Sequence, residues 1–166
     1  MEVLSMKTLI IYESKHGTTE MFANRLAEAF GDNSRAAHIK KAKKISLDEW
    51  DSVVLGAGIY IGKVKRSIKG YAKRNKDELE KKNLGIFLCC SWGSEENVYR
   101  EYFEKNFPPT LLEKAKVKQI FPGGQYLSEN AGMIYKKVFD EMEKLPEEEI
   151  HKMIDSFVRE MVLSSA

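Results

Sequence analysis

Segments typical of β-strands alternate with helical patterns along the whole chain. Each strand-like segment is followed by apolar residues that recur at helical spacing. The five expected strands are Thr8–Tyr12, Arg35–Ile39, Ser52–Leu55, Leu84–Cys90 and Val117–Phe121. Strands connected through helices run parallel, because each crossover returns the chain to the same end of the sheet. The sequence therefore predicts an α/β protein with a parallel sheet flanked by helices on both sides.

The composition of the strands predicts their order. Thr8–Tyr12, Ser52–Leu55 and Leu84–Cys90 are almost entirely apolar, as strands buried on both faces are. Arg35–Ile39 and Val117–Phe121 carry charges, as edge strands do. We therefore expect a three-layer, doubly wound five-stranded sheet in the order 2-1-3-4-5. Ligands of such sheets bind beyond the carboxyl ends of the strands, next to the first and third.

The helical patterns differ in length and in how they end. The first, around Phe22–Phe30, is closed by the turn residues that follow it. Val64–Leu79 predicts one long helix, and a helix starting near Ser94 is expected to end at Pro108 and Pro109. Two further helices are expected at Ala131–Met142 and Ile150–Met161.

Length and composition limit the class of protein. The chain has 166 residues, of which 43% are hydrophobic, so we expect a single domain over residues 1–166 with residues 1–5 as an extension outside the core. No apolar run approaches the roughly 18 residues of a membrane span. The two cysteines are adjacent and suit a reducing, cytoplasmic compartment. A net charge of +2 does not favour nucleic-acid binding.

The loop after the first strand has the composition of a phosphate site. Hydroxyl side chains, a glycine and the start of a helix provide hydrogen-bond donors and a positive electrostatic potential for a phosphate monoester. The residues are Ser14, Lys15, His16, Gly17, Thr18 and Thr19. An ordinary strand-to-helix turn capped by serine or threonine is the alternative interpretation.

The loops after the third and fourth strands add aromatic rings beside the same edge of the sheet. Glycines allow close approach of a flat ligand, and tyrosine or tryptophan offers a ring face. The residues are Gly58, Ile59, Tyr60, Ile61 and Gly62 in one loop and Ser91, Trp92 and Gly93 in the other. Together the three loops predict a site for a phosphorylated aromatic ligand.

These motifs resemble the flavodoxin superfamily. The likeness covers the whole chain and rests on S-K-H-G-T-T-E-x-F-A after the first strand and G-A-G-I-Y-I-G after the third. The glycine–tyrosine turn running into a basic helix is most similar to flavodoxin-domain proteins of the menaquinone-dependent protoporphyrinogen oxidase type. The resemblance implies noncovalent FMN, with its phosphate at residues 14–19 and its isoalloxazine between Tyr60 and Trp92. His16 stands where the family usually has a hydroxyl.

Two functions follow from this resemblance, and a third hypothesis departs from it. The first is an electron-transferring flavoprotein that moves electrons between partners through bound FMN. The second is a protoporphyrinogen oxidase-like enzyme that passes electrons to a quinone, and the third is a cofactor-free binding module. The sequence contains no Cys-x-x-Cys, His-x-x-x-His or Gly-x-Ser-x-Gly motif, so no metal ligands or catalytic residues are assigned.

Charge is concentrated in the predicted helix that follows the second loop. Residues 63–82 hold nine basic and three acidic residues, a local charge of +6 that leaves −4 for the rest of the chain. A basic surface there favours an acidic redox protein, a small-molecule substrate with carboxylates, or peripheral contact with an anionic membrane. A solvated helix face is the alternative interpretation.

Overall fold

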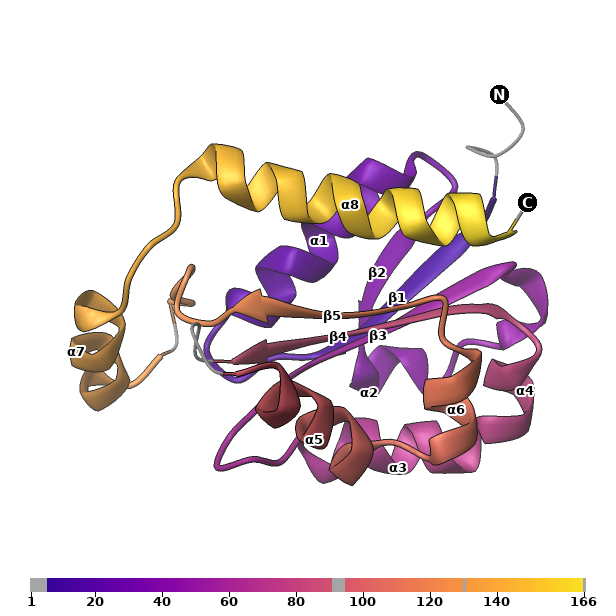
Figure 1. Ribbon diagram of the computed structural model, residues 1–166, viewed down its shortest axis with the longest axis horizontal. Helices are drawn as coiled ribbons and strands as arrows, with labels where there is room; N and C mark the ends of the chain where they lie inside the picture. Colours follow the sequence, from indigo (N-terminus) through magenta and orange to yellow (C-terminus); the bar gives the residue numbers. More distant parts are fainter. Residues whose placement is uncertain (1–5, 91–94, 130, 166) are drawn as a thin grey trace.

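The protein folds around a five-stranded parallel sheet in the order β2-β1-β3-β4-β5, as predicted (Figure 1). The structure, a computed structural model, describes residues 6–90, 95–129 and 131–165. The proposed extension at residues 1–5 therefore lies outside the described residues. The strands are β1 (Thr8–Glu13), β2 (Arg35–His38), β3 (Ser52–Gly58), β4 (Asn83–Cys90) and β5 (Val117–Pro122).

The polarity of the strands explains their positions. All residues of β1 and β3 are buried, and β4 is buried from its second residue onward. The two charged strands, β2 and β5, form the edges. β3 extends to Gly58, three residues beyond the predicted end, because Gly56 and Ala57 pair with both β1 and β4 and Gly58 pairs with Cys89 of β4.

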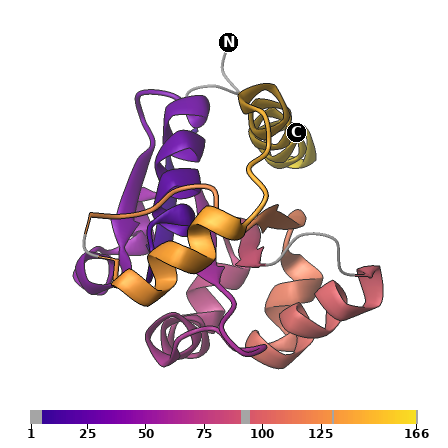
Figure 2. The same ribbon diagram turned by 90° about the vertical axis from the view of Figure 1, so that its left-hand side faces the viewer.

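Helices cover both faces of the sheet, and one helix lies beyond the carboxyl ends of the strands. α1 (Thr18–Phe30) and α8 (Glu147–Ser165) lie on one face. The other face is covered by the short elements α2 (Ile39–Ala42) and η2 (Leu47–Glu49) and by α3 (Arg66–Arg74), α4 (Lys76–Glu80), α5 (Glu96–Asn106) and α6 (Pro109–Lys114). α7 (Met133–Glu141) lies beyond the carboxyl ends of the strands (Figures 1 and 2).

The long helix predicted over Val64–Leu79 is wrong, because the structure has two helices there. α3 ends at Arg74 and α4 begins at Lys76. Asn75 separates them, and both its backbone N–H and its side-chain amide donate to the carbonyl of Tyr71. The break redirects the chain so that Leu79 is fully buried.

Two other boundaries also differ from the prediction. The prolines do not simply end α5, because Pro109 is the first residue of α6, a position at which a helix does not need the N–H that proline lacks. Ile39 leaves the second strand and starts α2, since the His38 imidazole accepts a hydrogen bond from the N–H of Lys40.

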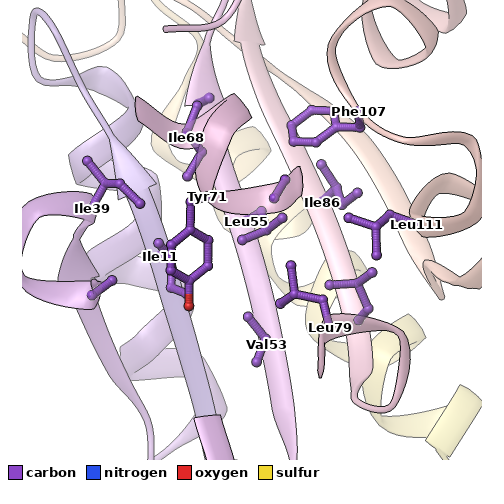
Figure 3. Packing of buried hydrophobic residues seen from close by; sticks show 14 of the residues in the cluster. Ile11, Ile39, Val53, Leu55, Ile68, Tyr71, Leu79, Ile86, Phe107 and Leu111 are labelled. Atoms are coloured by element: carbon purple, nitrogen blue, oxygen red, sulfur yellow. The ribbon is translucent and has the colours of Figure 1, made fainter. Parts of the chain in front are cut away.

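The alternation of side chains across the sheet divides the core into two layers. Leu9, Ile11, Val53 and Leu55 face the layer with α3 to α6, which Figure 3 shows. The intervening residues, such as Ile10 and Val54, face α1 and α8. Four fully buried phenylalanines fill that second layer, namely Phe22, Phe87, Phe121 and Phe157.

One glycine of β3 is required by this packing. A Cβ atom on Gly56 would lie 2.2 Å from the ring of Phe87, which is itself fully buried. We predict that Gly56→Ala lowers the free energy of unfolding by about 1–3 kcal/mol, as overpacking of a core does. Urea unfolding measures the change. Gly132→Ala is the matched control, because a Cβ there meets no atom within 4 Å; equal losses in the two variants would contradict the packing argument.

Candidate functional site

Loops from the carboxyl ends of β1, β3, β4 and β5 enclose a cavity of about 230 Å³. It brings together seven residues of the first two predicted loops and adds residues from β4 and from beyond β5. The other predicted residues of these loops, Lys15, Gly17, Ile61 and Gly62, do not line it. The lining residues are Ser14, His16, Thr18, Thr19, Gly58, Ile59, Tyr60, Cys89, Cys90, Gly123, Gly124, Tyr135, Val138 and Met142. Ser91, Trp92 and Gly93 of the third predicted loop lie outside the described residues.

A larger hollow of about 960 Å³ lies elsewhere, between α5, α6 and the outer edge of β5. Its walls include Tyr99, Phe103, Leu112 and Ile120. It contains none of the predicted site residues. The smaller cavity is therefore the candidate site, because it lies where parallel α/β sheets bind ligands.

The first predicted loop forms a closed turn at the start of α1. The Ser14 hydroxyl accepts a hydrogen bond of 3.1 Å from the N–H of Gly17. Gly17 has φ +114°, and a Cβ on it would lie 2.9 Å from the backbone nitrogen of Ser128. Glycine is therefore needed here both for its backbone conformation and for the close approach of a second chain segment.

The two threonines of the loop have different tasks. The Thr18 hydroxyl accepts hydrogen bonds from the N–H groups of Gln125 and Tyr126, so it fastens the segment after β5 to the loop. The Thr19 side chain lines the cavity beside the thiol of Cys89, and both side chains are buried. Only the structure separates these roles, since the sequence pattern treats the hydroxyls alike.

The second predicted loop is a tight reverse turn over residues 60–63. Tyr60 and Lys63 exchange backbone hydrogen bonds of 2.9 and 3.1 Å. Ile61 and Gly62 both have positive φ, at 52° and 73°. Ile61 is fully exposed, and a β-branched residue rarely adopts this conformation, so the tip of the turn is both strained and solvent-facing.

The ring of Tyr60 folds back toward the first loop. Its hydroxyl accepts a hydrogen bond of 3.2 Å from the N–H of Lys15, and the Lys15 ammonium lies 5.5 Å from the ring centroid. The Tyr60 side chain lies against Gly58, where a Cβ atom would be 2.6 Å from the tyrosine oxygen. Burial raises the pKa of Tyr60 to about 12, so the phenol stays protonated near neutral pH. The neighbouring N–H of Ile59 donates to the carbonyl of Cys89 and ties the turn to β4.

His16 lies between two aromatic rings. It stacks on Tyr135 of α7, with centroids 3.4 Å apart and planes 8° apart, and contacts Tyr60 edge-on at 5.9 Å. Burial is the main cause that lowers the pKa of the His16 imidazole below its usual 6.5, and the nearby charges of Lys15 and Lys65 lower it further. His16 is therefore mostly neutral at pH 7.

The structure adds residues that the sequence did not predict for this site. Gln125 and Tyr135 come from the region after β5, and Asn106 comes from the end of α5. A lone glutamine, tyrosine or asparagine outside a motif gives no signal in a single sequence. Their roles follow from tertiary contacts alone.

Asn106 holds the turn that carries Tyr60. Its side chain is only 1% exposed, accepts from the N–H of Val64 at 3.1 Å, and donates to the carbonyls of Gly62 and Tyr102. All of its main hydrogen-bonding directions are thus used within the protein. Asn106 therefore fixes the position of Gly62 relative to α5.

The described cysteines and acidic residues of the site have other roles than holding a metal ion. Burial raises the pKa of the Cys89 thiol to about 12 and that of Cys90 to about 11, so both buried thiols are protonated near neutral pH. Among the described residues, no group of three or more His, Cys, Asp or Glu side chains is placed to hold a metal ion. The buried carboxylate of Glu13 instead pairs with Lys65 at 3.3 Å.

A sequence model of the flavodoxin domain matches residues 9–152. The chain belongs to the flavodoxin domain family. This domain contains the first two loops and the region after β5. The finer resemblance to protoporphyrinogen oxidases and the extent of the domain over all of residues 1–166 stay predictions. No helix of the described residues is long and apolar enough to cross a membrane.

Known proteins similar to this flavodoxin-family chain include a sequence relative and solved structures. An uncharacterized protein, MJ0298 of Methanocaldococcus jannaschii, is 29% identical over 114 residues, which is 68% of each chain. Flavodoxin 2 of Bacillus cereus superposes with a TM-score of 0.58 at 17% identity, covering 95% of this chain and 99% of that one. A flavoprotein of Lactobacillus acidophilus in complex with FMN superposes with a TM-score of 0.51 at 15% identity, covering 70% of this chain and 93% of that one.

The chain also superposes on one portion of a larger protein. The chain spans 37% of the length of rubredoxin oxygen:oxidoreductase from Desulfovibrio gigas, at 16% identity, 96% coverage of this chain and a TM-score of 0.53. At these identities the likeness to solved structures shows the fold.

The hydrogen bonds between Asn106 and the turn can be tested by substitution. Asn106→Ala leaves three backbone groups without their partner, so we predict a loss of about 1–3 kcal/mol in unfolding free energy. Amide hydrogen exchange at Lys63 and Val64 should accelerate in the folded protein. Asn97→Ala on the exposed side of the same helix is the control. Unchanged exchange in the turn of a destabilised Asn106 variant would contradict its role in fixing Gly62.

Proposed function

We propose that this protein binds FMN noncovalently and transfers electrons between redox partners. The observation that carries the proposal is the meeting of the hydroxyl- and glycine-containing loop at the start of α1 with the Tyr60 turn at one cavity. Family membership and the fold of known flavoproteins support the same cofactor. The residues present fit FMN in kind, since they combine phosphate donors with aromatic surfaces.

The phosphate would be held by residues 14–19. The N-terminus of α1, a helix of 13 residues, directs backbone N–H groups and a positive dipole toward this loop. The hydroxyl of Ser14 accepts from Gly17 and keeps its own proton for donation. Thr18 acts indirectly, because its hydroxyl anchors residues 125 and 126. Lys15 adds a positive charge at the mouth of the site.

The isoalloxazine would lie against the Tyr60 turn. Tyr60 offers a ring face, and Asn106 holds the turn in place. Trp92 is the predicted partner on the opposite side. The bound flavin supplies the redox chemistry, while the protein binds it, orients it and sets its electrostatic surroundings.

The basic segment 63–82 is proposed as the surface that meets a partner. It begins beside the site, because Lys65 at the start of α3 pairs with Glu13 at the end of β1. Lys63, Arg66 and Lys73 are exposed. This surface complements an acidic redox protein, and the rate of electron transfer to such a partner would fall with ionic strength.

A protoporphyrinogen oxidase-like enzyme is a second candidate. The turn from Gly58 to Gly62 running directly into a basic segment favours it, because a porphyrinogen carries carboxylates that cations attract. Turnover of protoporphyrinogen with a menaquinone analogue would establish the enzyme. Electron transfer to an acidic protein partner without such turnover would establish the carrier.

The phosphate assignment predicts an asymmetry between two flavins. The double variant Ser14→Ala, Thr19→Ala removes two hydroxyls, and hydrogen bonds to a charged group contribute about 1.5–3 kcal/mol each. We expect FMN affinity to fall at least about tenfold and riboflavin affinity to change little. Flavin fluorescence titration measures both.

A remote hydroxyl provides the control for this experiment. Ser46→Ala removes a hydroxyl that caps η2 far along the chain from the loop, and should leave both affinities unchanged. Equal losses for FMN and riboflavin in the double variant would place the phosphate away from residues 14–19.

A further inference from the structure

Helix α7 forms the outer wall of the candidate cavity while remaining largely outside the core. Tyr135 and Val138 of this helix, with Met142 at its end, line the cavity. Every residue of α7 is exposed or only partly buried, and Met133 and Ile134 are 82% and 84% exposed. Figure 2 shows α7 lying across the edge of the sheet at which the strands end. A helix of nine residues held so loosely is marginally stable by itself.

Contacts at both ends attach α7 to the rest of the protein. The Gln125 side chain donates to the carbonyl of Glu143 and accepts from the N–H of Leu145, which holds the end of the helix. Before the helix, the N–H of Ser128 donates to the carbonyl of His16 at 2.7 Å. These bonds involve the flanking segments, so they allow the helix between them to move.

The ring of Tyr135 makes the contact that closes α7 over the cavity. It stacks on His16 with a centroid distance of 3.4 Å. Tyr135 lines the cavity together with Cys89. Burial raises the pKa of the Tyr135 hydroxyl, and the Cys89 thiol adds to this effect. An aromatic pair of this geometry contributes on the order of 0.5–1.5 kcal/mol beyond the area it buries.

The cavity is small for a ligand of the size of a flavin, so movement of one wall would enlarge it. Pockets for ligands of this size are usually about 300–1,000 Å³, and this cavity is about 230 Å³. The strand ends are fixed by the hydrogen bonds of the sheet, and the Tyr60 turn is fixed by Asn106. Among the walls that the structure describes, α7 has no buried residue and is held only at its ends and by the Tyr135 ring.

We propose that α7 is a lid over the flavin site and that Tyr135 latches it by stacking on His16. The proposal rests on the proposed FMN binding and identifies Tyr135 as the residue that controls entry and release of the cofactor. It gives His16 a defined task, because a hydroxyl at that position would offer no ring for Tyr135 to stack on. The lid opens by separation of these two rings, while the hydrogen bonds of Gln125 and Ser128 stay in place.

Stopped-flow mixing of the full chain with FMN tests the latch. Tyr135→Ala removes the ring, and the energy of an aromatic pair predicts that association and dissociation rates both rise about threefold to tenfold. Tyr135→Phe keeps the ring and should retain the wild-type rates. Ile134→Ala, a substitution of the exposed neighbour on α7, is the control and should also leave both rates unchanged.

Two results would overturn the lid. Unchanged rates in Tyr135→Ala would show that the stack does not limit entry, and a faster dissociation with unchanged association would make Tyr135 a simple ligand contact.

Hydrogen exchange measured without FMN tests the latch independently of the proposed FMN binding. Amides of residues 133–141 should exchange at least about threefold faster in Tyr135→Ala than in the wild type. The pKa of His16 should move up toward 6.5, because water replaces the lost ring. If the wild type does not bind FMN, the proposed function is wrong. Exchange of α7 then decides whether Tyr135 holds the helix, and equal exchange rates reject the latch.

Discussion

Burial of β1, β3 and β4 on both faces is the constraint on which the rest of the structure depends. Their side chains alternate between two apolar layers, so no ligand-binding group fits within the sheet. Parallel pairing sends the carboxyl ends of all five strands to one edge. The polar loops after β1 and β3 therefore meet there, although they are more than forty residues apart in sequence.

The segment after β5 completes the edge. It docks on the first loop through Thr18 and His16 and then returns over the cavity as α7. The close approach at Gly17 is possible because glycine has no Cβ to meet Ser128. The candidate site is thus assembled from chain segments that lie far apart in the sequence, and its geometry depends on how they pack.

The sequence predicted the sheet well because strand polarity reflects strand burial. The order 2-1-3-4-5 follows from apolar central strands and charged edges. Residues of the first two predicted loops line one cavity, and their part in ligand binding stays a prediction. The predicted helix over Val64–Leu79 was wrong because the side-chain hydrogen bond of Asn75 ends α3, which periodicity does not reveal. Asn106, Gln125 and Tyr135 were missed because their contacts lie far away in sequence.

Retention of FMN by the purified full chain is the most direct test of flavin binding. The chain is mixed with FMN, desalted, and examined by visible absorption, with riboflavin and FAD in parallel. The account predicts one FMN per chain and weaker retention of riboflavin, because residues 14–19 bind the phosphate. Loss of all three flavins on desalting would contradict it and would favour a cofactor-free binding module on the flavodoxin fold.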